Sequence, residues 1–351
     1  MTQTRGVIGY TCAYTPLPLF HAAGLAPYRV LPIHDCPDQS GHLLHDNLCP
    51  HVKRVLDRAM SGDVPAFSGM VFMNSCDSMR RLYDAWNAAR SDSKSILVDL
   101  PATVSDATIL FFRDEIARLK IFLESIIGEA ITGSDLIQGI ELHNRISALI
   151  AALQAARMNA SLTGGSSTLQ AAYNHASTTA PDEAIVYLKK MLGDSTAPGK
   201  DREGVPVYLF GNVLPEPEAF DLFESCGADI VSDDVCTGSR LFAPITGAPG
   251  PDPLRVLAES LLSKQPCART FDSANPGSLG EEIVESARRS NARGVIGYTA
   301  KFCDPYIARM PGVREALRKE GIPFLLLEGD CSLRSIGQHR TRIEAFIEMM
   351  R

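Results

Sequence analysis

Three cysteines of this chain occupy places where a thiol is readily converted to a thiolate. Cys49 is followed directly by a proline, and Cys76 and Cys303 are each followed by an aspartate that opens an expected helix. All three are therefore expected at turns that lead into a helix N-terminus. The partial positive charge at such an end stabilises an anion by about 0.3–1 kcal/mol and favours thiolate over thiol. Because iron–sulfur clusters are bound through thiolates, this arrangement is chemically suited to a cluster.

The spacing of the cysteines does not fit the common metal motifs. Nine cysteines in a chain without an expected export signal require an explanation, since a reducing cytoplasm does not favour structural disulfides. No Cys-x-x-Cys pair is present, so the sequence predicts neither a zinc ribbon nor a ferredoxin. A site with three cysteines would leave one iron without a protein thiolate, which is what a substrate-binding cluster needs.

Further candidate ligands are Cys12, Cys236 and Cys267. Cys12 follows the first expected strand, Cys236 lies in a loop beside two aspartates, and Cys267 is the second-half counterpart of Cys49. With these residues, six thiolates could surround a double cubane. The alternative for each is packing in the core or a hydrogen bond to cluster sulfide. The cysteines expected to be structural are Cys36, Cys226 and Cys331.

Strands alternate with helices in both halves of the chain, which predicts mostly parallel, doubly wound sheets. We expect a first α/β domain over residues 1–102, a helical insert over 103–204 and a second α/β domain over 205–351. The expected strands are 6–10, 28–31, 69–73, 96–98, 207–210, 229–231, 294–297 and 323–327. The expected helices are 19–23, 50–60, 78–89, 111–128, 136–158 and 216–226.

The two α/β halves read as copies of one plan, with Cys76 and Cys303 at equivalent places. The cluster is therefore expected in the cleft between them, because ligands bind beyond the carboxyl ends of parallel strands. The heptapeptide RGVIGYT occurs twice, starting at Arg5 and at Arg293. It falls out of register with the duplicated plan, so we interpret it as coincidence.

Composition and charge narrow the class of protein. Apolar residues make up 45% and charged residues 21% of the 351, as in an ordinary globular protein with a real core. A formal net charge of −7 argues against a nucleic-acid surface. No segment is typical of a signal peptide or a membrane span, so a cytoplasmic location is expected.

Six segments distributed along the chain resemble the signature segments of the 2-hydroxyacyl-CoA dehydratase D-component and benzoyl-CoA reductase family. The resemblance runs nearly end to end and implies cluster ligands at Cys49, Cys76 and Cys303. It also implies an ATP-hydrolysing iron–sulfur activator that supplies single electrons at very low potential. The segments are Gly9–Pro16 (GYTCAYTP), His21–Leu25 (HAAGL), Asn74–Arg81 (NSCDSMRR), Asp233–Arg240 (DDVCTGSR), Lys301–Pro305 (KFCDP) and Gly337–Phe346 (GQHRTRIEAF).

The resemblance is compatible with two kinds of cluster. The chain starts almost directly at its first strand, without the extension expected in the larger dehydratase subunits. Together with three further cysteines, this favours a double-cubane [8Fe-9S] reductase of small molecules. The alternative is a single [4Fe-4S] 2-hydroxyacyl-CoA dehydratase or benzoyl-CoA reductase-like subunit, whose open iron binds a thioester carbonyl and whose reaction passes through a ketyl radical. A homo- or heterodimer is expected by analogy.

Two hypotheses that assign the chain to other classes of protein stay open. A bilobal small-molecule-binding protein without a cluster would share the duplicated plan, but it gives no reason for thiolates at matched turns. A thiol redox regulator would use one or two accessible cysteines and bind no iron. No G-x-x-x-x-G-K-[ST] phosphate loop is present, so ATP hydrolysis is assigned to a partner.

Some charged residues have no assigned role. Asp233 and Asp234 could provide a general acid or cap a turn. Four arginines could contact coenzyme A phosphates or a partner, although a solvated surface position is expected for each: Arg80, Arg81, Arg240 and Arg342.

Overall fold

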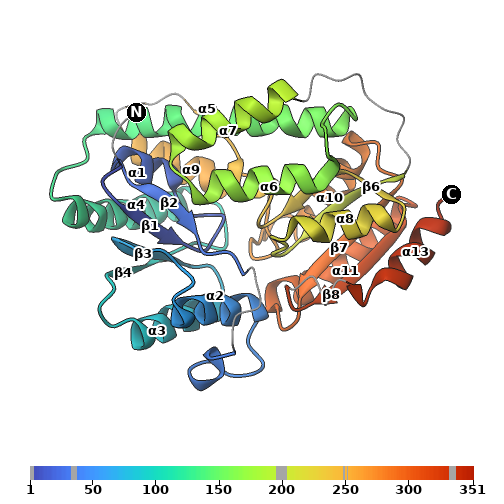
Figure 1. Cartoon of the computed structure of the whole chain (residues 1–351), viewed down its shortest axis with the longest axis horizontal. Coiled ribbons are helices and arrows are strands. Elements are labelled where there is room, and N and C mark those ends of the chain that lie inside the picture. The colour runs from blue at the N-terminus through green and yellow to red at the C-terminus, as the bar shows by residue number, and fades with distance from the viewer. Residues whose placement is uncertain (1–3, 33–37, 195–203, 248–249, 251, 332–336) are drawn as a thin grey trace.

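Two four-stranded parallel sheets form the framework of the chain, one in each half of the sequence (Figure 1). The computed structural model describes residues 4–32, 38–194, 204–247, 250, 252–331 and 337–351. The strand order is β2-β1-β3-β4 in the first sheet and β6-β5-β7-β8 in the second, so both have the same topology. The first sheet contains β1 (Val7–Tyr10), β2 (Ala26–Arg29), β3 (Gly69–Asn74) and β4 (Ser95–Asp99). The second contains β5 (Val205–Gly211), β6 (Ala228–Val235), β7 (Gly294–Ala300) and β8 (Phe324–Gly329).

Helices cover the sheets, as expected for parallel strands whose residues are buried on both faces. On the second sheet, α8 and α13 pack on one face, and α10 and α11 on the other. The predicted α/β class with two duplicated, doubly wound sheets is therefore confirmed. The helices of the first half are α1 (Leu17–Ala22), α2 (Pro50–Ser61) and α3 (Asp77–Ala89). Those of the second half are α8 (Pro217–Ser225), α9 (Pro253–Ser263), α10 (Ser278–Arg289), α11 (Asp304–Lys319) and α13 (Arg340–Glu348).

The helices that come between the two halves in the sequence form a layer that lies along both sheets (Figure 1). Ser105 and Thr132 each cap the following helix through a capping box, which satisfies the first backbone amides of α4 and α5. Near the far end of α5, Arg157 forms buried ion pairs with Glu224 and Asp229 of the second half. The layer consists of α4 (Asp106–Ile127), α5 (Gly133–Met158), α6 (Gly165–Thr178) and α7 (Pro181–Asp194).

Residues of the second half also enter the first core. A 3-10 turn, η2 (Ser239–Phe242), and helix α9 bury Leu241, Phe242 and Leu257 in the same cluster as the first sheet. The two sheets are thus joined by packing on more than one side. In the described part of the chain, no helix is both long and apolar enough to cross a membrane.

The repeated heptapeptide falls on strands that are not equivalent. Its first copy forms β1 and its second forms β7, whereas the topology pairs β1 with β5 and β3 with β7 as counterparts. The interpretation of this repeat as coincidence agrees with the sheet order.

The close crossing of α1 and α5 gives a test of this packing. A Cβ at position 139 would lie 2.2 Å from the carbonyl oxygen of Pro18, which belongs to the main chain and cannot rotate away. We expect Gly139→Ala to lower the free energy of unfolding by about 1–3 kcal/mol. Gly133→Ala, in the same helix with no atom within 4 Å, should leave stability unchanged or raise it by up to about 1 kcal/mol. Anaerobic urea unfolding followed by circular dichroism measures both, and equal midpoints would contradict the close contact.

Candidate metal centre

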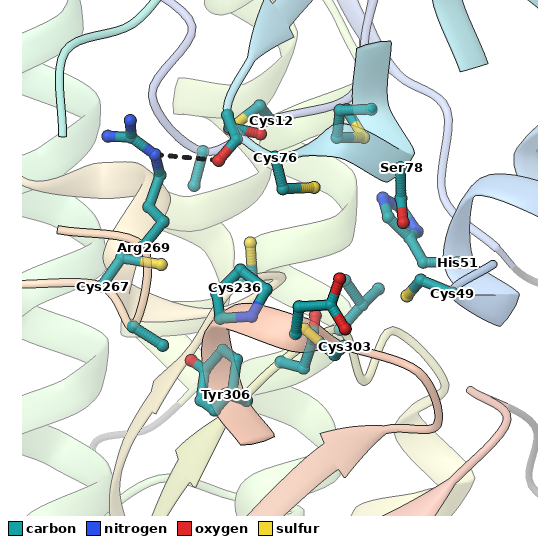
Figure 2. A pocket seen from close by; sticks show the side chains of 18 of the residues that line it. Cys12, Cys49, His51, Cys76, Ser78, Cys236, Cys267, Arg269, Cys303 and Tyr306 are labelled. Carbon is teal, nitrogen blue, oxygen red and sulfur yellow. Dashed lines mark hydrogen bonds between the residues drawn. The ribbon is translucent and has the colours of Figure 1, made fainter. Parts of the chain in front are cut away.

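A cavity of about 490 Å³ lies where the two sheets face each other, and six cysteines line it. They come from both halves, because the carboxyl ends of both sets of strands point to the same space. Figure 2 shows the side chains arranged around this space rather than paired along one wall. The structure thus brings all the proposed ligands together: Cys12, Cys49, Cys76, Cys236, Cys267 and Cys303.

Three of the thiols stand at helix N-termini, as predicted. Cys49, Cys76 and Cys303 are the N-cap residues of α2, α3 and α11, and none of them caps its helix through its own side chain. The main-chain amides of these first turns therefore face the thiols without competition from a capping oxygen. Phe302 has a φ of 56°, an uncommon backbone conformation for a residue with a side chain, directly before Cys303.

Burial disfavours the charged form of most of these thiols. It raises the pKa of Cys76 to about 12 and also raises the pKa of Cys12 and of Cys267. The pKa of Cys303 is raised first by a hydrogen bond shared with Cys49 and then by burial. Metal ions reverse this preference, because a coordinating thiol is deprotonated by the ion itself.

Arg29 is a buried cation of the first half that contacts Cys236 of the second half. Arg29 is the last residue of β2 and is 1% exposed. It donates to the carbonyl oxygen of Cys236 at 2.6 Å and to the Cys236 sulfur at 3.5 Å. Burial alone would raise the pKa of Cys236, but the charges of Arg29 and Arg240 outweigh it and lower this pKa below its ordinary value.

Arg240 is a second buried cation, and the expectation that it is solvated is wrong. It is 4% exposed, and Asp234 accepts from its Nε at 2.9 Å and from its Nη2 at 2.7 Å. Its Nη1 donates to the Cys267 sulfur at 3.7 Å and to the Tyr306 hydroxyl at 3.1 Å. Asp234 therefore orients an arginine. Asp233 caps the following turn by accepting from the Ser239 amide at 3.0 Å.

The other arginines considered from sequence behave as expected. Arg80 and Arg81 are about half exposed on α3 and pair with Asp77. Arg342 is also exposed and donates to the Leu326 carbonyl oxygen at 2.9 Å. None of these three side chains lines the cavity.

Two more cations join the halves beside the cavity. Arg269 donates to the carbonyl oxygens of Ser75, Leu100 and Pro101, all in the first half, at 3.0, 2.7 and 2.7 Å. Lys264 donates to the Ala13 carbonyl oxygen at 2.7 Å. Burial lowers the pKa of Lys264 to about 8.

Several polar atoms around the cavity have no partner among the described residues. They are the hydroxyls of Thr11 and Tyr14 and the Nδ1 of His51. An unsatisfied buried polar group costs about 1–3 kcal/mol, so such atoms are typical of a cavity that holds another group. In the described chain, no three His, Cys, Asp or Glu side chains converge on one ion position. The thiols surround a volume instead, and thiol donors around a volume fit an iron–sulfur cluster.

Two cysteines do not line the cavity. Cys226 lies in the core under α8 and α13, as expected for a structural residue. Cys331 is 1% exposed, has a φ of 65° and belongs to a small buried cluster with Cys49. Cys36, also expected to be structural, lies outside the described residues.

Neither His51 nor the buried arginines were recognised as site residues from sequence. His51 follows Cys49 by two positions, and this spacing is the one local signal that could have indicated it. Arg29 is a single charged residue beside the apolar Val30 and Leu31 in an expected buried strand.

Comparison with known proteins identifies related chains. The family model for the 2-hydroxyglutaryl-CoA dehydratase D-component matches residues 12–350. The chain is 26% identical to the (R)-phenyllactyl-CoA dehydratase beta subunit of Clostridium sporogenes, covering 100% of this chain and 93% of the relative. It is 24% identical to the (R)-2-hydroxyglutaryl-CoA dehydratase beta subunit of Acidaminococcus fermentans, with coverage of 99% and 93%. It is 22% identical to a benzoyl-CoA reductase subunit of Thauera aromatica, with coverage of 92% and 85%. With its match extending over almost every residue, the chain belongs to the 2-hydroxyglutaryl-CoA dehydratase D-component family.

Proposed function

We propose that this chain is an iron–sulfur redox subunit whose cavity holds a double-cubane [8Fe-9S] cluster. The observation that supports it is the gathering of six thiols, from both halves, around a single cavity. When bound, such a cluster supplies irons that take up and pass on single electrons at low potential. The proposed ligands are Cys12, Cys49, Cys76, Cys236, Cys267 and Cys303.

The thiols fall into two groups that suit two cubanes. Cys12, Cys236 and Cys267 are close enough for their charges to affect one another's pKa values. Cys303 shares a hydrogen bond with Cys49, and the charge of Cys303 raises the pKa of Cys76 more than the charges of Cys12 and Cys267 do. Each group could hold one cubane, and the space between the groups would take the bridging sulfide.

A single [4Fe-4S] cubane on the group of Cys49, Cys76 and Cys303 is the alternative. It is favoured by the names of the relatives, which are acyl-CoA dehydratase and reductase subunits. Its open iron would bind a thioester carbonyl and deliver one electron to it. Chain length does not separate the two types, because this chain covers 93% of the (R)-phenyllactyl-CoA dehydratase beta subunit. The distinction therefore depends on Cys12, Cys236 and Cys267.

Family membership supports an enzyme over a bilobal binding protein or a thiol regulator. The matched relatives are named as subunits, so partner proteins follow for this chain as well. We propose a homo- or heterodimer in the cytoplasm. We also propose a separate ATP-hydrolysing iron–sulfur activator as electron donor, because the sequence has no phosphate-binding loop.

The first prediction concerns cluster content. Anaerobically prepared protein should contain iron and acid-labile sulfide, at about eight irons per chain for the double cubane. Cys49→Ala, Cys76→Ala and Cys303→Ala should each lose most of the iron, because each removes a thiolate from the cavity. Cys226→Ala, at a buried thiol away from the cavity, is the control and should keep its iron. Full iron content in one of the three cavity variants would show that its thiol is no ligand.

A second prediction separates the two cluster types. Cys12→Ala, Cys236→Ala and Cys267→Ala should each reduce iron to about four per chain or fewer if a double cubane is present. Iron and sulfide analysis, with iron anomalous scattering from an anaerobic crystal, measures this directly. About four irons in the unaltered protein, unchanged in all three variants, would decide for the single cubane.

The third prediction concerns the electron source. Reduction of the cluster should require the activator together with hydrolysable ATP, since the sequence contains no G-x-x-x-x-G-K-[ST] phosphate loop. Stopped-flow absorbance and electron paramagnetic resonance should show reduction with ATP and none with a non-hydrolysable analogue. Sustained turnover with a mild donor and no nucleotide would contradict this dependence.

A further inference from the structure

The two groups of cavity thiols differ in the charges that face them. Arg29 donates to the sulfur of Cys236 and Arg240 to the sulfur of Cys267, at 3.5 and 3.7 Å. Among the described residues, no arginine or lysine donates to the sulfur of Cys49, Cys76 or Cys303. The buried cations therefore gather at one end of the cavity.

At the opposite end of the cavity, which contains Cys49, Cys76 and Cys303, the nearby donors are neutral. The first-turn amides of α3 and α11 lie beside Cys76 and Cys303, and the uncharged Asn212 side chain lines the same cavity. Arg269 lies beside Cys267 (Figure 2), and its side-chain donors are engaged by main-chain carbonyl oxygens, including that of Ser75. Neutral hydrogen bonds stabilise added negative charge less than charged donors do.

Arg29 is the more informative of the two cations. Arg240 is neutralised by Asp234, with which it shares two hydrogen bonds. Arg29 is 1% exposed, its Nε has no partner, and no described carboxylate forms an ion pair with it. Burying a guanidinium charge is costly unless an anion faces it, and the described side chain that accepts from Arg29 is that of Cys236. Its Nη1 and Nη2 nitrogens both donate to Cys236.

We infer that Arg29, assisted by Arg240, makes the Cys12, Cys236 and Cys267 end of the cavity the end that accepts the electron. This rests on the double cubane proposed above. Positive charge and hydrogen bonds to cluster sulfur raise the reduction potential of an iron–sulfur centre. One electron leaves the reduced iron–sulfur activator, which is oxidised, and reduces iron at this end, with no bond formed or broken. Arg29 acts through the sulfur of Cys236, and its role is to position a positive charge beside that sulfur.

The test is an anaerobic redox titration of the cluster-loaded protein, followed by visible absorbance and electron paramagnetic resonance. The unaltered protein should be reduced in two separate steps. Arg29→Met, which removes the charge and keeps the bulk, should shift the step at higher potential to a more negative value and leave the other in place. Arg29→Lys should restore most of the shift.

Arg58→Met is the matched control, because Arg58 is also buried but pairs with Asp63 and does not line the cavity. It should lower thermal stability without moving either step. Equal potentials in Arg29→Met and the unaltered protein would overturn the inference, as would an equal shift in the control.

Iron content separates this inference from the proposed function. An unaltered protein without iron contradicts the proposed function itself, whereas full iron with unmoved potentials contradicts only the role of Arg29. Arg29→Gln, which keeps a donor but no charge, is measured if Arg29→Met loses its iron, and it should show the same negative shift. Loss of iron from both neutral variants would overturn the inference too, because Arg29 would then be needed to assemble the site.

Discussion

The docking of two carboxyl sheet edges against each other is the constraint on which the site depends. The first half contributes Cys12, Cys49 and Cys76 to the cavity, and the second half contributes the other three thiols. Neither half could surround the cavity alone. Three cations bind main-chain carbonyl oxygens across this junction: Arg29 at Cys236, Lys264 at Ala13 and Arg269 at Ser75. Charged donors make these hydrogen bonds roughly twice as strong as neutral ones, so the edges that carry the thiols are held firmly together.

The helical layer keeps the two edges in this orientation. Helix α5 crosses α1 so closely that Gly139 has no room for a side chain, and its other end is tied to the second half through Arg157 and Asp229. Between these points, Asn144 exchanges hydrogen bonds with the main chain of Ile245 at 2.9 and 2.7 Å. A helix anchored at three places cannot bend easily, so the spacing between thiols of different halves is set by rigid elements rather than by loops.

Sequence reasoning was effective where local chemistry determines structure. The apolar runs of parallel strands are nearly continuous, and Cys49, Cys76 and Cys303 come directly before helices. Helices α6 and α7 lie within the expected helical insert but were not predicted as separate helices. The burial of these cations could not be predicted from the sequence, for a physical reason. The burial of Arg29 depends on Cys236, which is 207 positions away, so no local sequence pattern indicates it.

Arg240 shows a related limit of sequence reasoning. It lies six residues beyond Asp234 in a polar loop, where solvated charge is the ordinary outcome. It is buried because η2 packs into the first core, so its neighbours Leu241 and Phe242 carry it inward. Such a placement follows from the docking of the halves, which the alternation of strands and helices does not specify.

The balance of charge in the cavity explains why Arg29 has no acidic partner among the described residues. Burial raises the pKa of Cys12, Cys76 and Cys267, and the arginine charges near Cys12 and Cys267 offset this only in part, so iron would supply the remaining positive charge. Cys236 differs, because arginine charge lowers its pKa in the protein alone. A carboxylate paired with Arg29 would cancel the charge that Cys236 experiences. The described contacts of Arg29 instead direct its charge to Cys236, at the end of the cavity where the chain itself, and not the metal alone, supplies positive charge.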